Sequence, residues 1–273
     1  MLVNRRATLS LRAVALLYLA VILLVPLTMI FWRTFEHGLG AAWGWVTTPA
    51  AISALWLSIL IAAIAVPLNT IFGVGCAMLL VRAKGRATSV LDAIIDLPFV
   101  VSPVIVGLAL VLVYGQGGWF GDWFLNQGIR IIYAPAGMVI ATVFVSLPFV
   151  VREVAPVLQE VGDEQEQAAA TLGASGWQTF WRVTLPSIRW GVAYGVVLTT
   201  ARALGEIGAV AVVSSNVAGS TLTLPLLVQQ RDSQVVGAHG LTGAYAAGTE
   251  LALISLVVLL VMTALAPRKD ESA

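Results

Sequence analysis

The chain of 273 residues is 59% hydrophobic and only 11% charged, and its mean hydropathy is +0.93. Soluble domains carry about 25% charged residues, so these few charges cannot cover a soluble surface of this size. A net charge of +1 provides no global basic field for nucleic acid, and a single cysteine excludes an internal disulfide. The composition therefore predicts an integral membrane protein with no nucleic-acid partner.

Six apolar runs are long enough to cross a bilayer, since a spanning helix needs about 20 apolar residues. They cover roughly 13–32, 52–81, 93–114, 136–155, 190–213 and 248–266. The third run contains Pro98 and Pro103, so we expect its start to be irregular or kinked. The pattern predicts an all-α protein with six transmembrane helices, in which 13–266 is the membrane domain between tails at 1–12 and 267–273.

Basic residues fall mostly on one side of this six-span arrangement. They are Arg5, Arg6, Arg12, Arg82, Lys84, Arg86, Arg152, Arg182, Arg189, Arg268 and Lys269, against Arg33, Arg130 and Arg231 on the other side. Because cytoplasmic loops carry the excess of Lys and Arg, we predict that both termini are cytoplasmic. The loop over about 156–188 is then cytoplasmic, and the loops near 33–50, 115–135 and 214–247 face outward.

No catalytic or metal-binding motif appears in the chain. A phosphate-binding GxxxxGK[ST] loop, a GxSxG elbow and an HExxH pair are all missing, and no His, Cys or carboxylate cluster has metal-ligand spacing. We therefore predict a protein that is not an enzyme and has no catalytic residue, metal or cofactor of its own. If ATP drives it, another chain binds the nucleotide.

A polar island over 163–186 interrupts the apolar runs. Asp163 and Glu166 have the spacing of a capping box, Gly173 suits the residue after a helix end, and Ser175 with Gln178 predicts the start of a second helix. A helix that lies on lipid headgroups is typically basic on its polar face, whereas this island begins with acidic residues. The pattern favours two short helices that contact a protein partner.

The spacing of this island resembles the EAA loop of ATP-binding cassette (ABC) importer permeases. The matching residues are Ala168, Ala169, Leu172, Gly173, Val183, Leu185 and Pro186. The resemblance implies a methionine-importer-like permease fold with a core over about 50–262, a cytoplasmic coupling loop over 163–186, and two separate ATPase subunits that bind ATP and Mg²⁺. The implied ATPase-docking residues are Glu166, Gln167, Ala168, Ala169, Leu172, Gly173, Ala174 and Phe180. Gln167 occupies the usual Glu position of the motif, so either Gln167 or Glu166 makes the polar contact.

Two further segments resemble the oxyanion importers of this class. The run ARALGEIGAV over 201–210 and the run LTLPL over 222–226 are most similar to the sulfate/thiosulfate type, and within it to the W-type permease subunit. The resemblance implies a T-type sister permease, an extracytoplasmic sulfate-binding protein, and a multi-pass position in the bacterial plasma membrane. Molybdate/tungstate import is the alternative within the class, and a self-contained secondary anion transporter is the alternative outside it.

The run over 201–210 also places two charges within a predicted span. Arg202 and Glu206 are four residues apart and share a helix face, so they form either an internal ion pair or part of an anion route. Gly205 and Gly208 permit close approach of another helix or a ligand. Candidate hydrogen-bond donors along an anion pathway are Ser102, Ser214, Ser215 and Asn216.

Overall fold

The computed structural model describes residues 5–83, 85–233 and 238–265, and within these ranges every regular element is helical. The helices are α1 (Arg5–Phe35), α2 (Leu39–Val46), α3 (Pro49–Arg82), α4 (Arg86–Val100), α5 (Pro103–Tyr114), α6 (Gly121–Asn126), α7 (Pro135–Val161), α8 (Glu164–Thr171), α9 (Gly176–Thr179), the π-helical segment η1 (Phe180–Thr184), α10 (Leu185–Leu204), α11 (Gly208–Val213), α12 (Leu224–Ser233) and α13 (Ala238–Leu265). The expected all-α class is confirmed. The predicted tail at 267–273 lies outside the described residues, and α1 begins inside the predicted tail at 1–12.

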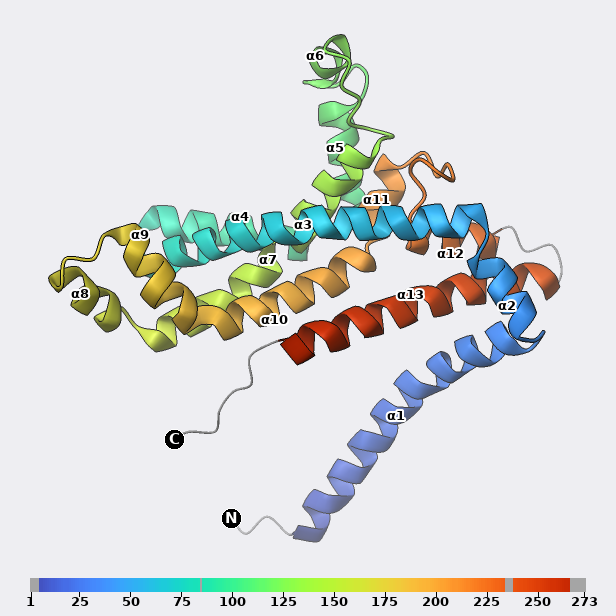
Figure 1. Ribbon diagram of the computed structural model, residues 1–273, viewed down its shortest axis with the longest axis horizontal. Helices are drawn as coiled ribbons and strands as arrows, with labels where there is room; N and C mark the ends of the chain where they lie inside the picture. The colour runs from blue at the N-terminus through green and yellow to red at the C-terminus, as the bar shows by residue number, and fades with distance from the viewer. Residues whose placement is uncertain (1–4, 84, 234–237, 266–273) are drawn as a thin grey trace.

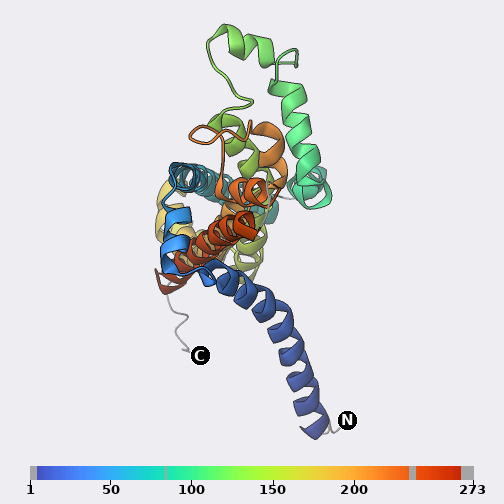
Figure 2. The same ribbon diagram turned by 90° about the vertical axis from the view of Figure 1, so that its right-hand side faces the viewer.

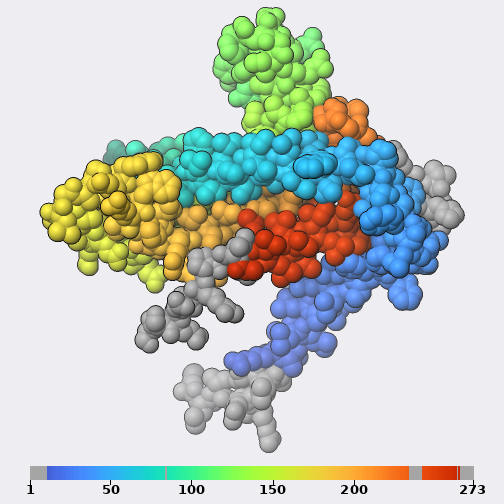
Figure 3. All heavy atoms as spheres, viewed as in Figure 1, coloured from blue at the N-terminus to red at the C-terminus, as the bar shows by residue number. Residues whose placement is uncertain are grey.

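Helices α3, α7 and α10 form the centre of the molecule, with α13 beside them along the same long axis (Figure 1). Helix α1 leaves this bundle at an angle, and α5 with α6 projects from the opposite side (Figures 1 and 2). The space-filling view shows α8 and α9 as one end of the bundle and α2 at the other end (Figure 3). The polar loop is therefore a compact end piece on the central helices.

Small residues let the central helices approach at backbone distance. A Cβ built on Gly73 of α3 would lie 2.6 Å from Cβ of Val150 on α7, and one on Gly195 of α10 would lie 2.9 Å from Cα of the same valine. Val150 itself is completely buried. In lipid the hydrophobic effect does not drive helices together, because lipid tails are as apolar as the helix surfaces. Van der Waals packing at small residues, where backbones approach closely, is therefore a main source of association energy.

Four described helices are long and apolar enough to cross a membrane, or five when the bent pair α4 and α5 counts as one span. The four are parts of α1, α3, α7 and α13, and α4 meets α5 at an angle of 109°. Helix α10 is not among them, because Arg189 and Arg202 lower its hydropathy. The six predicted spans are reached only when the bent pair and α10 are both included.

The structure corrects the boundaries of two predicted spans. The third is two helices rather than one kinked helix, because Pro103 begins α5 and restricts Ser102 to an extended conformation. The fifth is not continuous over 190–213, because α10 ends at Leu204 and α11 begins only at Gly208. The predicted outer loop over 214–247 contains α12 and the first turns of α13.

Arg231 of α12 fastens the end of the bundle that lies opposite α8. Its guanidinium donates to the carbonyl of Gly243 at 3.1 Å, to the carbonyl of Trp45 at 3.2 Å and to Oγ1 of Thr48 at 2.9 Å. The same group lies 5.3 Å from the centre of the Trp45 ring. Burial lowers the pKa of Arg231, yet an arginine remains the charged donor at any physiological pH.

Candidate functional site

The predicted coupling loop consists of α8, a glycine turn, α9 and η1. Gly173 has φ of 85°, and the amides of Gly173 and Ala174 return to the carbonyls of Ala170 and Ala169, each at 3.0 Å. Ser175 forms the expected capping box, since its amide donates to Oε1 of Gln178 at 2.9 Å and its Oγ accepts from the Gln178 amide at 3.4 Å. These two local predictions are confirmed.

The expected capping box at the start of α8 is wrong. Asp163 occupies the N-cap position but its side chain makes no capping hydrogen bond. Glu166 does not return to the helix start either, because its Oε1 accepts from Nη2 of Arg82 at 3.0 Å and from Oγ1 of Thr184 at 2.8 Å. A distant arginine, which sequence spacing cannot place, takes the carboxylate that a capping box needs.

The exposed residues of the loop include one large apolar side chain among small and polar ones. The Leu172 side chain is 88% exposed, and Gln167, Ala168 and Gly173 are exposed beside it along the chain. Of the other predicted docking residues, Ala169, Ala174, Glu166 and Phe180 are only partly exposed. A leucine so exposed on an end piece of the bundle is suited to contact with another protein.

An aromatic cluster follows this face, and it joins the predicted docking residue Phe180 to two tryptophans that were not predicted from sequence. Trp177 lies 6.3 Å from Phe180 and 5.6 Å from Trp181, measured between ring centres. Trp177 is 72% exposed and Trp181 is 50% exposed. Two tryptophans four residues apart in an otherwise polar segment were the signal that could have identified this surface.

Near the middle of the bundle, the break between α10 and α11 is stabilised by Glu206. Its Oε1 accepts from the amide of Ala209 at 2.8 Å, so the carboxylate caps α11. Its Oε2 lies 2.7 Å from Nη1 of Arg202, where the Arg202 side chain is 30% exposed and that of Glu206 only 1%. At this distance the two groups form an ion pair between residues four positions apart. The geometry favours the internal ion pair of the two sequence interpretations.

The bend between α4 and α5 packs directly against this break. A Cβ built on Gly208 would lie 2.9 Å from Cβ of Pro103, and one on Gly107 would lie 2.7 Å from the carbonyl oxygen of Ala209. Ser102 is exposed at the bend and does not cap α5 with its side chain. Non-helical backbone at membrane depth is tolerated where it is buried in protein or lines a cavity, and transporters place binding sites at such breaks.

Two of the other predicted donors, Ser214 and Ser215, are engaged within their own loop. Ser214 Oγ donates to the carbonyl of Thr221 and accepts from the amide of Asn216 at 2.9 Å, and Ser215 Oγ lies 2.7 Å from Oγ1 of Thr221. Asn216 takes a left-handed conformation, with φ of 55°. These bonds fold the connection after α11. The Asn216 side chain only accepts a bond there, from Ser214 Oγ at 3.5 Å, and Ser102 lies apart at the bend between α4 and α5.

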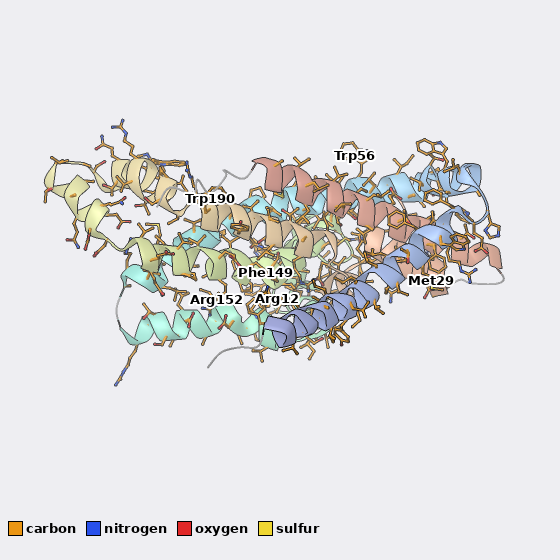
Figure 4. All side chains as sticks on the ribbon, turned by 90° about the horizontal axis from the view of Figure 1, so that it is seen from below. Arg12, Met29, Trp56, Phe149, Arg152 and Trp190 are labelled. Atoms are coloured by element: carbon orange, nitrogen blue, oxygen red, sulfur yellow. The ribbon has the colours of Figure 1, made fainter. Side chains whose placement is uncertain are left out.

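A second ion cluster, which the sequence interpretation did not include, joins α4 to α7. Nη2 of Arg152 lies 2.8 Å from Oδ1 of Asp92 and 2.5 Å from Oδ2 of Asp96, and Phe149 makes an edge contact with Phe99 at 5.4 Å. Figure 4 shows Arg152 and Phe149 between these two helices. The two aspartates are four residues apart, which was the available signal, but their cation comes from another helix.

The chain matches the sequence profile of one protein family over residues 69–271. That family is described as "Binding-protein-dependent transport system inner membrane component". Relatives of known type are similar over nearly the whole chain. The sulfate transport system permease protein CysW of Synechocystis sp. is 48% identical over 94% of this chain and 91% of its own length, and CysW of Escherichia coli K12 is 42% identical over 94% and 87%. CysT of the same Synechocystis strain is 37% identical over 92% of this chain and 87% of its own length.

Solved structures share the fold at low sequence identity. A chain of a bacterial ABC transporter that imports the acidic polysaccharide alginate aligns with a TM-score of 0.79 at 16% identity, covering 98% of this chain and 97% of that one. A chain of the MetNI methionine ABC transporter aligns with a TM-score of 0.57 at 14% identity, covering 79% of this chain and 94% of that one. At these identities the alignments concern architecture alone.

Proposed function

Because the chain belongs to the family of binding-protein-dependent transport system inner membrane components, we propose that it is the membrane-spanning subunit of an ATP-driven sulfate importer. The observation that supports sulfate as the substrate is the 48% identity to a sulfate permease over 94% of the chain. Thiosulfate, a tetrahedral dianion of similar size, is the expected second cargo.

The proposal assigns separate tasks to separate chains. Two ATPase subunits bind ATP and Mg²⁺ and dock on coupling loops, a T-type sister permease completes the pathway, and an extracytoplasmic sulfate-binding protein delivers the anion. This chain has no catalytic role. Its similarity to both CysW and CysT proteins supports a pair of related permeases.

The orientation follows from the same assignment. We place the α8–α9 end in the cytoplasm, where an ATPase can reach Leu172, and the α2–α12 end on the outer side of the plasma membrane. Both termini are then cytoplasmic, in agreement with the distribution of Lys and Arg.

The physical task is to move a dianion through a medium that rejects it. Transfer of an isolated ion into a medium of low dielectric constant costs tens of kcal/mol by Born solvation. A protein pathway replaces water with donors, and ATP binding and hydrolysis stabilise outward-open and inward-open states in turn. We place the pathway at the junction of Ser102, Gly205 and Gly208, where two helix breaks meet. The docking contact is placed on Gln167, Ala168, Leu172 and Gly173.

The test is uptake of radiolabelled sulfate in a strain that lacks the transporter and receives this chain with its partner genes. Sulfate should accumulate, and thiosulfate should compete. Accumulation of molybdate or tungstate with no accumulation of sulfate would replace sulfate as the substrate, and uptake without any ATPase subunit would overturn the ATP-driven assignment.

A further inference from the structure

We propose that Arg82 and Glu166 form a rigid clasp that transmits movement of the coupling loop to the transmembrane bundle, an inference that rests on the proposed function. The clasp consists of Arg82, Glu166, Thr184 and the carbonyl of Gly162. In it Glu166 is a positioning residue and makes no contact with the ATPase.

The clasp joins four segments at one point. Nη2 of Arg82, the last residue of α3, donates to the Gly162 carbonyl at 2.7 Å and to Oε1 of Glu166 at 3.0 Å. The same Oε1 accepts from Oγ1 of Thr184 at 2.8 Å. Oε1 of Glu166 therefore connects α8 with the end of α3 and the entry to α10, and Nη2 of Arg82 adds the end of α7.

Partial burial makes this pair stronger than an ordinary surface ion pair. The side chains of Arg82 and Glu166 are 26% and 23% exposed, and Thr184 is buried. Exposed pairs are worth little, because water and salt screen them and both long side chains lose conformational entropy. Charge-assisted hydrogen bonds in a less hydrated site are shorter and stronger.

Helix α8 has few other direct contacts with the central helices: α9 and η1 run without a break into α10, and Oγ of Ser187 on α10 donates to Oε1 of Gln165 at 3.4 Å. Helix α8 packs mainly on α9 and η1, and it is joined to α7 through Gly162, a glycine with φ of 70°. A glycine turn bends easily and cannot by itself pass on a tilt. Since α3, α7 and α10 are the central helices, a clasp at their shared end passes a displacement of α8 to all three. The π-helical segment that ends at Thr184 has a geometry that recurs at functional sites.

The geometry also separates docking from transmission. Leu172 is on the exposed face of the loop, whereas Glu166 faces Arg82. Loss of the clasp should therefore leave the ATPase attached while the bundle fails to follow it. A purely structural salt bridge would give a different result, namely lower yield with unchanged coupling in the protein that remains.

The experiment uses the complete complex in proteoliposomes with the sulfate-binding protein. Arg82→Gln and Glu166→Gln are compared with Arg86→Gln and Glu164→Gln, which neutralise exposed charges close by in the chain. We expect the ATPase to co-purify at the wild-type ratio in all four variants. Sulfate moved per ATP hydrolysed should fall about fivefold or more in the clasp variants only, which is the lower end of typical coupling between sites. The charge exchange Arg82→Glu with Glu166→Arg should recover part of this ratio.

Three results of this proteoliposome experiment would overturn the clasp. The first is a normal ratio of sulfate to ATP in both clasp variants. The second is loss of the ATPase from Glu166→Gln but not from Arg82→Gln, which would make Glu166 a docking residue. The third is a fall in yield with an unchanged ratio.

A readout that needs no cargo separates this inference from the choice of substrate. An environment-sensitive fluorophore is attached at Trp43→Cys in a Cys76→Ala background, on α2 at the opposite end of the bundle (Figure 1). ATP should change its emission in the parent protein and not with Arg82→Gln added. If the parent complex moves no sulfate yet shows this difference, the proposed substrate is wrong and the clasp is supported. An ATP response that is equal in both proteins would contradict the clasp.

Discussion

Asn69 of α3 donates a hydrogen bond from Nδ2 to Oγ of Ser146 on α7, at 2.8 Å, and both side chains are completely buried. Ser146 in turn donates to the carbonyl of Thr142 one helical turn earlier. The pair thus fixes the register of the two helices that pack most extensively on each other. A polar bond between helices in an apolar bundle has no water to replace it.

We expect Ser146→Ala to lower the free energy of unfolding by about 1 kcal/mol, because it leaves the Asn69 amide without an acceptor. Thermal unfolding of the purified protein in detergent measures the change. Asn69→Leu combined with Ser146→Ala should cost less than the two single changes added together. Strict additivity would mean that the bond contributes nothing, and Ser233→Ala at an exposed position is the control.

The sequence was sufficient for the helical class, the polar loop and its local turns, because each depends on residues close together in the chain. Gly173 and the Ser175–Gln178 box are examples. The sequence was insufficient for side-chain contacts whose two residues are far apart in the chain. Asn69 with Ser146, and Glu166 with Arg82, are 77 and 84 positions apart, and periodicity carries no information on such pairs.

Gly195 offers a test of close helix packing. Alanine there would place Cβ 2.9 Å from Cα of Val150, a backbone atom that cannot rotate away. We expect Gly195→Ala to destabilise the protein by about 1–3 kcal/mol, the usual range for overpacking. Gly75→Ala on α3 is the matched control, since no atom lies within 4 Å of its added Cβ. There the better helix propensity of alanine should leave stability unchanged or raised. Equal effects at both sites in the same unfolding assay would contradict the packing argument.

The ion pair at the α10–α11 break gives a third prediction. Arg202→Ala should reduce the amount of folded protein sharply, since an unpaired buried carboxylate costs about 3–5 kcal/mol. Adding Glu206→Gln should restore much of the yield, because a glutamine can still accept from the Ala209 amide. Yield is measured by size-exclusion chromatography in detergent. Normal yield of Arg202→Ala with sulfate uptake lost would instead assign Arg202 to the anion pathway.

The break itself shows why part of the pathway escaped prediction. Arg202 and Glu206 have ideal spacing for one helix, and Gly205, directly after Leu204, was the available sign that the helix ends between them. Glu206 serves two partners, the Arg202 guanidinium and the amide that starts α11. Likewise the bend at Ser102 has a visible cause in Pro103, but its 109° angle depends on packing against Gly208. Local signals locate such breaks better than they give the direction of the chain beyond them.

Leu172 tests the docking surface independently of the clasp. Its side chain is 88% exposed, so Leu172→Asp removes little contact within this chain and should leave yield and thermal stability unchanged. In the complex the same change buries a carboxylate against the ATPase, and truncation at the centre of an interface often costs 2 kcal/mol or more, about 30-fold in affinity. We therefore expect the ATPase subunits to be lost during co-purification, together with sulfate uptake. Val217→Asp, at an exposed apolar position in the loop after α11, is the control and should retain them. Full retention of the ATPase by Leu172→Asp would show that this face of the loop is not where the partner binds.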